Sequence, residues 1–358
     1  MNRSKLGWND SLEEQLLRWS GSGLAPGRIV GEAGHGYDVE TDAGRFNAVV
    51  SGHFRYIAAC RADYPAVGDW VLLRGEKDPL QIERVLERGG FLSRRAAGRK
   101  CDEQVIAANI DLMLIVAALD GGRNFTQHGI ERYIVMVRDG GAMPVIVLNK
   151  CDLCSESERS DYRAMARSVA GDIPVIMVSA LTGEGMEQLQ EFLTPGITAA
   201  LTGPSGAGKS ALINYLLGKE IQKTGALREN DMRGRHTTTR RELFMLGGGA
   251  MVIDTPGLRE LRPFGDAGSI DMAFTEISSA AGGCRFSDCT HTNEPGCEVL
   301  RLVSEGRIEF GRYQNYITIR NEMMSLEMMK SEQGRLQRKS RDKALSKLVK
   351  SYLKEHGK

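Results

Sequence analysis

An eight-residue loop, Gly203-Pro204-Ser205-Gly206-Ala207-Gly208-Lys209-Ser210, constrains this chain of 358 residues more than any other feature. It fits the pattern G-x-x-x-x-G-K-[ST] and lies between an apolar run at 198–201 and a helical pattern at 211–217. In that setting backbone N–H groups curl around phosphates at the start of a helix. The loop therefore predicts a phosphate-binding site from Gly203 to Ala211, with Lys209 directed to the β- and γ-phosphates and Ser210 to Mg²⁺.

Residues 106–262 alternate between apolar runs and helical patterns. The apolar runs are expected to be strands, at 110–119, 145–148, 175–178, 198–201, 243–246 and 251–253, with helices at 156–170 and 185–193 among others. The stretch 112–119 is uninterrupted, as expected for a strand that is buried on both faces. This alternation predicts an α/β core with a mostly parallel sheet.

The tetrapeptide Asp254-Thr255-Pro256-Gly257 follows the apolar run at 251–253. An Asp at the end of such a strand is typical of P-loop enzymes, where it lies on the magnesium side of the site. We expect the backbone N–H of Gly257 to contact a γ-phosphate. The motif is weak alone, but its position after a phosphate-binding loop makes it a strong prediction.

The motif Asn149-Lys150-Cys151-Asp152 closes one expected strand, and Ser179-Ala180 closes the next. A carboxylate at position 152 can accept the N1–H and N2–H₂ groups of guanine, a pair of donors that adenine lacks. A backbone N–H at the Ser179-Ala180 turn is expected to read guanine O6. Cys151 and Cys154 overlap the motif, and we interpret their spacing as a coincidence rather than a redox or metal pair.

The segment Arg233-Gly234-Arg235-His236-Thr237-Thr238-Thr239 lies between the phosphate-binding loop and Asp254. A Thr of this segment is expected to complete the Mg²⁺ shell, with Thr237, Thr238 and Thr239 as candidates. Leu258 stands where many small GTPases have the Gln that orients the attacking water. Slow intrinsic hydrolysis is therefore expected. His236 is the candidate for the missing group, and an RNA contact or a solvated loop position is the alternative interpretation of this side chain.

The order of these motifs is unusual. Small GTPases have the phosphate-binding loop first, then the switch Thr, D-x-x-G, N-K-x-D and S-A, whereas here N-K-x-D and S-A come first and D-x-x-G comes last. The set is complete but circularly permuted. Permutation moves only the termini, so the same site can form. A GTP-hydrolysing site is therefore predicted, and the switch after Gly257 leads directly into the C-terminal region.

Three cysteines and one histidine gather within 14 residues, namely Cys284, Cys289, His291 and Cys297. Four ligands of this kind suit a closed tetrahedral Zn²⁺ site, whose role is structural because it leaves no open position. Unligated cysteines or a disulfide are the alternatives, and a reducing compartment disfavours the disulfide.

The remaining segments predict further domains. Residues 25–88 have short runs rich in Val, Ile, Tyr and Phe between Gly and Asp, which predict a small all-β barrel of the OB-fold type. The other boundaries are expected as follows: 1–24 an N-terminal helical extension, 89–105 a basic linker, 106–262 the permuted GTPase domain, 263–325 a helical zinc-binding domain, and 326–358 a basic C-terminal helix or tail.

Charge is segregated along the chain, although the total is only +1. The segments 88–100, 223–241 and 326–358 carry +5, +4 and +6, which leaves −14 on the rest of the chain. These segments suit binding to RNA phosphates, and a solvated face is the alternative for each.

Composition limits the cellular setting. No apolar run approaches the roughly 18–20 residues of a membrane-spanning helix, and residues 1–15 lack the apolar core of a secretory signal. Seven cysteines, an odd number, argue against a disulfide scaffold and for a reducing compartment. We therefore expect a cytoplasmic protein with no membrane association, and a monomer because no heptad seam is present.

The joint order of motifs resembles that of the bacterial ribosome small-subunit-dependent GTPase A family. The resemblance rests on N-K-C-D, S-A, G-P-S-G-A-G-K-S, R-G-R-H-T-T-T, D-T-P-G and C-x4-C-x-H-x5-C, with P-A-V-G-D-W-V at 65–71, and it covers about residues 25–305. It implies an OB-fold, a permuted GTPase domain and a zinc domain. It also implies docking on the 30S ribosomal subunit and its 16S rRNA late in maturation, with GTP hydrolysis to GDP stimulated by that subunit.

Two other functions fit the same residues. An RNA-binding module could use guanine nucleotide as a structural ligand with negligible turnover, or a GTPase could act on another RNA such as tRNA. The intact Lys209, Ser210 and Asp254 favour an enzyme, because a degenerate site would be expected to lose some of them.

Overall fold

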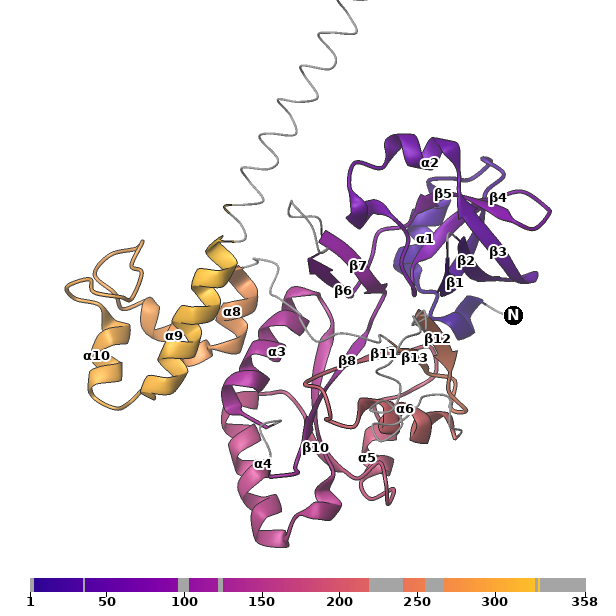
Figure 1. Cartoon of the computed structure of the whole chain (residues 1–358). Helices are drawn as coiled ribbons and strands as arrows, with labels where there is room; N and C mark the ends of the chain where they lie inside the picture. Colours follow the sequence, from indigo (N-terminus) through magenta and orange to yellow (C-terminus); the bar gives the residue numbers. More distant parts are fainter. Residues whose placement is uncertain are drawn as a thin grey trace, which may run out of the picture. The chain divides into compact units, whose positions relative to one another are not determined.

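The computed structural model describes residues 3–34, 36–95, 103–121, 125–218, 241–254, 267–325 and 328. The chain divides into two compact units (Figure 1). The first comprises Met1–Arg95 and Asp102–Arg262, and the second comprises Ala96–Cys101 and Pro263–Lys358.

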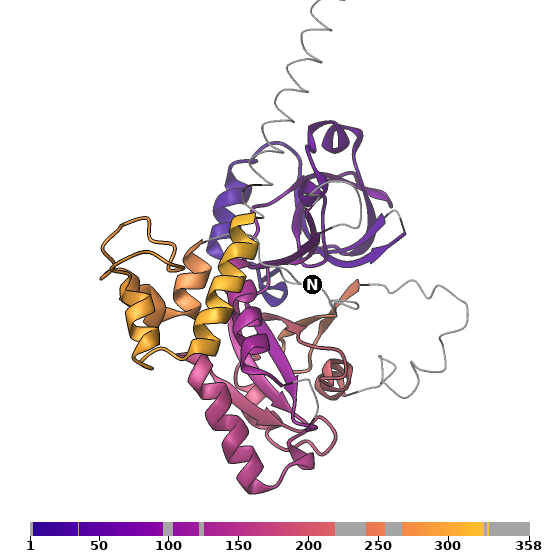
Figure 2. The same cartoon turned by 60° about the vertical axis from the view of Figure 1, so that its left-hand side comes forward.

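Five strands in the first unit close into a small barrel. They are β1 (Ala25–Ala33), β2 (Gly36–Thr41), β3 (Gly44–Val50), β4 (Trp70–Arg74) and β5 (Leu80–Val85). Their order is β1-β2-β3-β5-β4 with β1 also paired to β4, and the β3–β5 step is parallel. This is the five-stranded topology of an OB-fold, which confirms the predicted barrel. Helix α2 (Gly52–Ile57) lies between β3 and β4 and is seen at one end of the barrel in Figure 2.

The N-terminal segment forms a short helical extension. A 3₁₀ turn at Arg3–Leu6 precedes helix α1 (Asp10–Leu17). The side chain of Asn9 caps α1 by accepting a hydrogen bond from the Leu12 backbone N–H at 3.0 Å. Leu6 and Leu12 are buried, so one face of this extension contributes to the core of the unit.

A second sheet region has the α/β pattern that the sequence predicts. Its strands are β8 (Leu112–Ala118), β9 (Met143–Asn149), β10 (Val175–Val178), β11 (Thr198–Thr202), β12 (Arg241–Met245) and β13 (Met251–Asp254). Their order is β10-β9-β8-β11-β13-β12, and β12 alone among these six runs antiparallel to its neighbour. Helices α3 (Gln127–Asp139) and α4 (Glu156–Ala170) cover one face, and α5 (Met186–Gln190) and α6 (Lys209–Leu217) cover the other (Figure 1).

Strand β8 shows why the sheet needs helices on both faces. All seven of its residues are buried. Leu112, Leu114 and Val116 belong to the apolar core that includes Leu189 of α5 and Leu212 of α6. Because side chains alternate along a strand, the residues between them face the opposite layer. An uninterrupted apolar run is therefore what this position in the fold requires.

Hydrogen bonds join the barrel to the α/β sheet without a break. Strand β1 pairs with β12 in the register Gly31↔Glu242 and Glu32↔Arg241. The same contact carries an ion pair between Arg241 Nη1 and Glu32 Oε2 at 2.8 Å. The two regions therefore form one continuous sheet within the first unit.

Arg28 of β1 links the barrel, the N-terminal turn and the α/β sheet from a position that is 1% exposed. Its guanidinium donates hydrogen bonds to the carbonyl oxygens of Leu6, Gly68 and Asn109 and to the hydroxyl of Thr198. Burial lowers the pKa of Arg28 to about 10, although Asp111 and Asp69 act in the opposite direction. The buried cation thus depends on these fixed acceptors.

Strands lie at both ends of the expected basic linker, 89–105. Strands β6 (Phe91–Arg95) and β7 (Glu103–Ala108) form an antiparallel two-stranded sheet. Leu92, Val105 and Ile106 are buried, which gives this pair an apolar face to cover. A linker was predicted here because basic and glycine residues lie between the two strands. Residues 96–102 lie outside the described ranges.

Short helices make up the described part of the second unit, as predicted. They are α8 (Ala267–Ala273), α9 (Thr275–Ala281), α10 (Glu298–Ser304) and a helix over 310–325. Phe274, Ile277, Val299 and Ile319 are fully buried and form their common core. Of the basic tail at 326–358, only residue 328 is described. Across the described ranges, no helix has both the length and the apolar character needed to cross a membrane.

Candidate active site and metal centre

Motifs that are distant in the chain meet at one edge of the α/β sheet. Strand β9 ends at Asn149, β11 leads into Gly203 and β13 ends at Asp254. Ser179 follows β10, and Asp120 comes shortly after the end of β8. Because these five strands are parallel neighbours, their carboxyl ends lie together, which is where ligands bind in open α/β sheets.

The loop between β11 and α6 has two positions that only glycine can occupy. Gly203 has φ +133° and Gly208 has φ +92°. A Cβ atom on Gly203 would lie 2.1 Å from the carbonyl oxygen of Val116, and one on Gly208 would lie 2.1 Å from Asn149 Nδ2. The loop therefore packs directly against β8 and against the N-K-x-D motif.

Lys209 begins helix α6 and turns back over the loop. Its Nζ atom donates to the carbonyl oxygens of Gly203 at 2.8 Å and Pro204 at 2.7 Å. The ammonium group is thus held beside the loop backbone at the N-terminus of a helix, where both the cation and the helix dipole favour an anionic ligand.

The side chain of Asn149 connects three motifs. Its Nδ2 atom donates to the carbonyl oxygen of Ala207 at 2.9 Å, and its Oδ1 atom accepts from the N–H of Ala180 at 3.1 Å. The residue is 1% exposed. Asn149 therefore ties the phosphate-binding loop to the turn after β10.

Asp152 lies in a 3₁₀ turn, Cys151–Leu153, directly after β9. Its Oδ1 atom is buried and has no hydrogen-bond partner among the described residues. A buried carboxylate oxygen without a donor is unfavourable. The position is suited to an N–H group of a bound ligand.

The turn after β10 is shaped by Ser179, which is fully buried. Its Oγ atom accepts hydrogen bonds from the N–H groups of Leu181 at 3.3 Å and Thr182 at 3.1 Å. The serine thus fixes the turn from within, while the neighbouring Ala180 N–H faces Asn149.

Two charged residues of this region escaped sequence reasoning. Asp120 accepts a hydrogen bond from Lys150 Nζ at 2.8 Å. Asp120 could have been predicted from its position, because it follows an apolar strand as the other motif residues do. Arg159, in the first turn of α4, contacts both the N-K-x-D loop and Glu184. No local pattern marks it.

Several predicted residues lie outside the described ranges. These are His236, Thr238, Thr239 and Gly257, together with Leu258. Cys151 and Cys154 are both free thiols, and Cys154 Sγ donates to the carbonyl oxygen of Leu119 at 3.2 Å.

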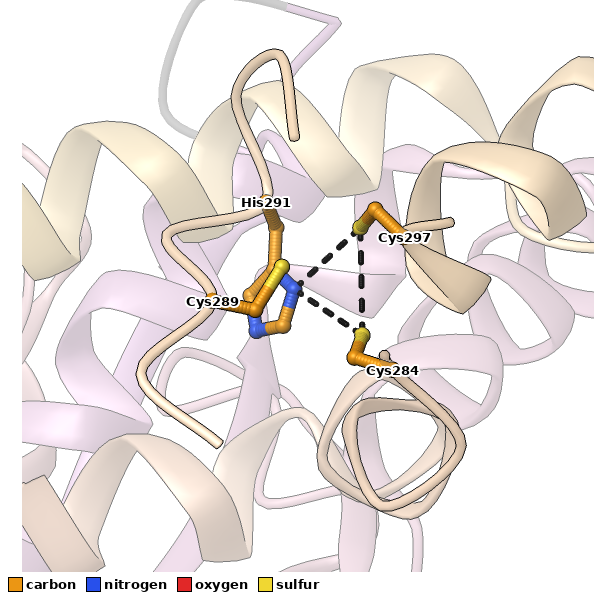
Figure 3. Close-up of side chains that lie close together, drawn as sticks. All are labelled: Cys284, Cys289, His291 and Cys297. Atoms are coloured by element: carbon orange, nitrogen blue, oxygen red, sulfur yellow. Dashed lines mark hydrogen bonds between the residues drawn. The ribbon is translucent and has the colours of Figure 1, made fainter. Parts of the chain in front are cut away.

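The second unit brings Cys284, Cys289, His291 and Cys297 together (Figure 3). Their ligand atoms all lie within 4.8 Å of one another. His291 Nδ1 is 3.6 Å from Cys284 Sγ and 3.4 Å from Cys297 Sγ, and these two sulfurs are 3.9 Å apart. The group has the composition and spacing to hold a metal ion.

The backbone around the cluster holds the ligands in place. His291 has φ +57°, a left-handed conformation that is uncommon outside glycine, and its carbonyl oxygen accepts a hydrogen bond from the Tyr313 hydroxyl at 2.7 Å. Burial alone would raise the pKa of Cys284, but N–H groups of Val299 and Glu298 and the neighbouring thiols lower it below its ordinary value. Burial raises the pKa of Cys297 to about 11.

The fold and the converging motifs define a circularly permuted P-loop GTPase with an N-terminal OB-fold barrel and a C-terminal helical unit. The family model described as RsgA GTPase matches residues 85–263. A protein of Lactiplantibacillus plantarum named small ribosomal subunit biogenesis GTPase RsgA 2 is 42% identical over 353 residues, which cover 98% of each chain. A Leptospira interrogans protein named small ribosomal subunit biogenesis GTPase RsgA is 38% identical and covers 98% of this chain and 96% of its own. The chain belongs to the RsgA GTPase family and is a GTPase.

Solved structures agree with this assignment. The crystal structure of YjeQ from Thermotoga maritima matches with a TM-score of 0.62 and 27% identity, over 84% of this chain and 99% of that chain. The structure of YloQ, described as a circularly permuted GTPase, matches with a TM-score of 0.58 over 85% of this chain and 95% of its own. At 21% identity, YloQ supports the fold alone.

Proposed function

We propose that this protein acts in the biogenesis of the small ribosomal subunit, where it docks on the 30S subunit and its 16S rRNA and hydrolyses GTP late in maturation. The observation that carries the proposal is the alignment of nearly the whole chain with relatives named for this process, together with the motifs at the sheet edge. Such a protein works in the cytoplasm, and we infer that it acts as a monomer.

Guanine recognition is assigned to the N-K-x-D loop and the turn after β10. The unpaired Oδ1 of Asp152 supports this assignment, because guanine N1–H and N2–H₂ supply the donors that this carboxylate lacks. Asn149, Lys150 and Cys151 shape the same loop, and Ser179 and Ala180 form the side that faces O6.

Phosphate binding and hydrolysis are assigned to the loop from Gly203 to Ala211 and to Asp254. Lys209 holds the β- and γ-phosphates, Ser210 contributes its hydroxyl to Mg²⁺, and Asp254 lies on the magnesium side. A bound Mg²⁺ would neutralise charge that develops on the phosphates. On sequence grounds, the site is completed by Gly257, His236 and one of Thr237, Thr238 and Thr239.

A structural zinc ion is assigned to the cluster of Cys284, Cys289, His291 and Cys297. Zn–S and Zn–N bonds of roughly 2.3 and 2.0–2.1 Å imply tetrahedral edges of about 3.8 Å between sulfurs and about 3.6 Å between sulfur and nitrogen. The observed separations of 3.9, 3.6 and 3.4 Å are close to these values. Four protein ligands leave no position for a substrate, so the ion would stabilise the unit.

One experiment tests the proposed function against its alternatives. GTP hydrolysis by the full chain is measured alone and with purified 30S subunits, 50S subunits or tRNA. Stimulation by 30S subunits alone is expected. Stimulation by tRNA instead would indicate a GTPase acting on another RNA, and negligible turnover in every mixture would indicate an RNA-binding module with a structural nucleotide.

A further inference from the structure

Arg159 of α4 holds both ends of the turn that carries Asp152. Its Nε atom donates to the carbonyl oxygens of Cys151 at 3.0 Å and Cys154 at 3.2 Å. These two carbonyls lie on either side of Asp152 in the sequence. One N–H group therefore closes the turn around the carboxylate that is assigned to guanine.

The other end of the same guanidinium holds the second loop. Nη1 donates to Glu184 Oε1 at 2.6 Å, and Nη2 donates to Glu184 Oε2 at 3.3 Å. Planar guanidinium groups form such paired bonds in a fixed geometry. Arg159 thus spans the space between the loop after β9 and the loop after β10.

Glu184 is itself firmly connected to the turn that begins at Ser179. Its carbonyl oxygen accepts from the Ser179 N–H at 2.9 Å. The next residue, Gly185, has φ +71°, and a Cβ atom there would lie 2.1 Å from the carbonyl oxygen of Met177 on β10. Asn149 holds this loop at Ala180, and Arg159 holds it four residues further along.

The ion pair itself contributes little to stability. The side chains of Arg159 and Glu184 are 20% and 49% exposed, so solvent screens much of their attraction. Solvent-exposed pairs of this kind contribute little to the free energy of unfolding. Their geometric effect is larger, because a purine edge read by two loops is discriminated only if the loops keep a fixed separation.

We propose that Arg159 is a positioning residue for guanine selectivity, which holds Asp152 at the distance from the Ser179-Ala180 turn at which its carboxylate accepts from the N2 amino group of guanine as well as from N1–H. This inference rests on the guanine site proposed above. It assigns selectivity to a residue that touches neither the base nor the phosphates.

The test compares GTP with ITP, which lacks the N2 amino group, as substrates of full-length protein. For Arg159→Gln we expect the GTP-to-ITP ratio of kcat/KM to fall about tenfold through a higher KM for GTP, with kcat within about twofold of the original. Arg159→Lys should recover only part of the ratio, because a single ammonium cannot reproduce the forked contacts. The matched control is Arg163→Gln, one turn later on α4, whose exposed side chain contacts Met177 Sδ at 3.3 Å and should keep the original ratio.

Two results would overturn the role of Arg159. One is an unchanged ratio in Arg159→Gln, and the other is an equal loss for GTP and ITP, which would mean general loosening rather than lost selectivity. If Arg159→Gln does not fold, Glu184→Gln carries the same test from the other side of the contact, with an intermediate loss of the ratio expected. If the unsubstituted protein does not prefer GTP over ITP and ATP, the result would instead contradict the proposed guanine site itself.

Discussion

At Asp152, one buried oxygen is expected to decide which base the protein accepts. Asp152→Asn replaces one carboxylate oxygen with an NH₂ donor, so the N1–H and N2–H₂ groups of guanine lose one of their two acceptors and meet a donor instead. We expect the affinity for GTP to fall roughly 10- to 100-fold. The affinity for XTP should rise, because xanthine has a carbonyl group at C2 that an amide can bind. Competition binding with GTP and XTP measures both changes.

Asp161→Asn is the control for that substitution, since this exposed carboxylate lies on the same helix as Arg159 and outside the proposed site. It should leave both affinities unchanged. If Asp152→Asn retained full preference for GTP over XTP, Asp152 would not be the residue that reads guanine.

His236 is expected to supply the group that Leu258 cannot. His236→Ala should bind GTP with near-original affinity and lose most of the turnover that 30S subunits stimulate, by roughly 10²- to 10⁴-fold for a general acid–base role. Single-turnover hydrolysis with 30S subunits measures the loss. Full stimulated turnover in this variant would eliminate the catalytic role and leave an RNA contact as the better interpretation.

Residues within short motifs were predictable, and residues with distant partners were not. Lys209 and Asp254 stand in local patterns that follow strands, so the sequence marks them directly. Arg28 looks like any basic residue of a strand, because its acceptors lie from Leu6 to Thr198 along the chain. Arg159 has the same character, since Glu184 is 25 residues away.

At the scale of elements, strands with continuous apolar runs were predicted well, and elements that mix polar and apolar residues were predicted poorly. The runs that became β8, β9, β11 and β13 are almost entirely buried, so hydrophobicity alone marks them. Helix α2 was not predicted within the β-rich region, although Ser51 caps it by accepting from the Phe54 N–H at 3.0 Å. Strands β6 and β7 were not predicted, because the basic residues between them indicated a linker.

Metal removal should act on the second unit and spare the first. Treatment with a strong chelator is expected to lower the helical circular-dichroism signal and the Tm of the full chain, because the cluster joins the segment after α9 to the start of α10. GTP affinity should change less than about threefold. Elemental analysis should find one zinc per chain, and Cys60→Ser, at an exposed cysteine outside the cluster, should leave that ratio unchanged. Protein with no bound metal and the same helicity would contradict the assignment.

Arg28 should be a major determinant of how the barrel joins the α/β sheet. Arg28→Met keeps much of the side-chain volume but leaves the buried carbonyl oxygens of Gly68 and Asn109 with fewer donors. We expect the first unit to lose about 3 kcal/mol of unfolding free energy. Denaturant unfolding followed by tryptophan fluorescence reports it, because Trp70 lies against this guanidinium.

Arg45→Met is the control for that loss. Arg45 also forms ion pairs, with Asp38 and Glu242, but its side chain is 50% exposed. Its replacement should cost less than about 1 kcal/mol. If both substitutions lowered the unfolding free energy equally, Arg28 would not be a major determinant of the contact between the barrel and the α/β sheet.

At the scale of the whole molecule, segregated charge predicts salt-sensitive binding to the ribosome. The net charge of +1 conceals +15 on the segments 88–100, 223–241 and 326–358. Contacts with phosphates release counterions, so binding to 30S subunits should weaken about tenfold or more between 100 and 300 mM KCl. Replacing the lysines of 326–358 with Gln should flatten this dependence. Affinity that stays constant as salt rises would exclude these segments as the docking surface.

The permuted order of motifs predicted the architecture more firmly than any single motif did. It implied that the segments at Asn149, Ser179, Gly203 and Asp254 form one site, and the strands that lead to them, β9, β10, β11 and β13, lie in one parallel sheet with β8 between β9 and β11. The order could not predict that the barrel continues the same sheet. That contact depends on β1 and β12, which are separated by about 200 residues and pair over two positions.

Strand β12 belongs to two structures at once. One edge pairs with β13, which ends at Asp254, and the other pairs with β1 of the barrel. A shift of β12 therefore breaks backbone hydrogen bonds unless both neighbours follow. Coupling between two binding sites is reciprocal. If a bound nucleotide changes the affinity of the barrel for a partner by some factor, the partner changes the affinity for the nucleotide by the same factor. Coupling through β12 would therefore make the barrel a sensor of its partner, because binding of that partner would change the affinity of the chain for GTP.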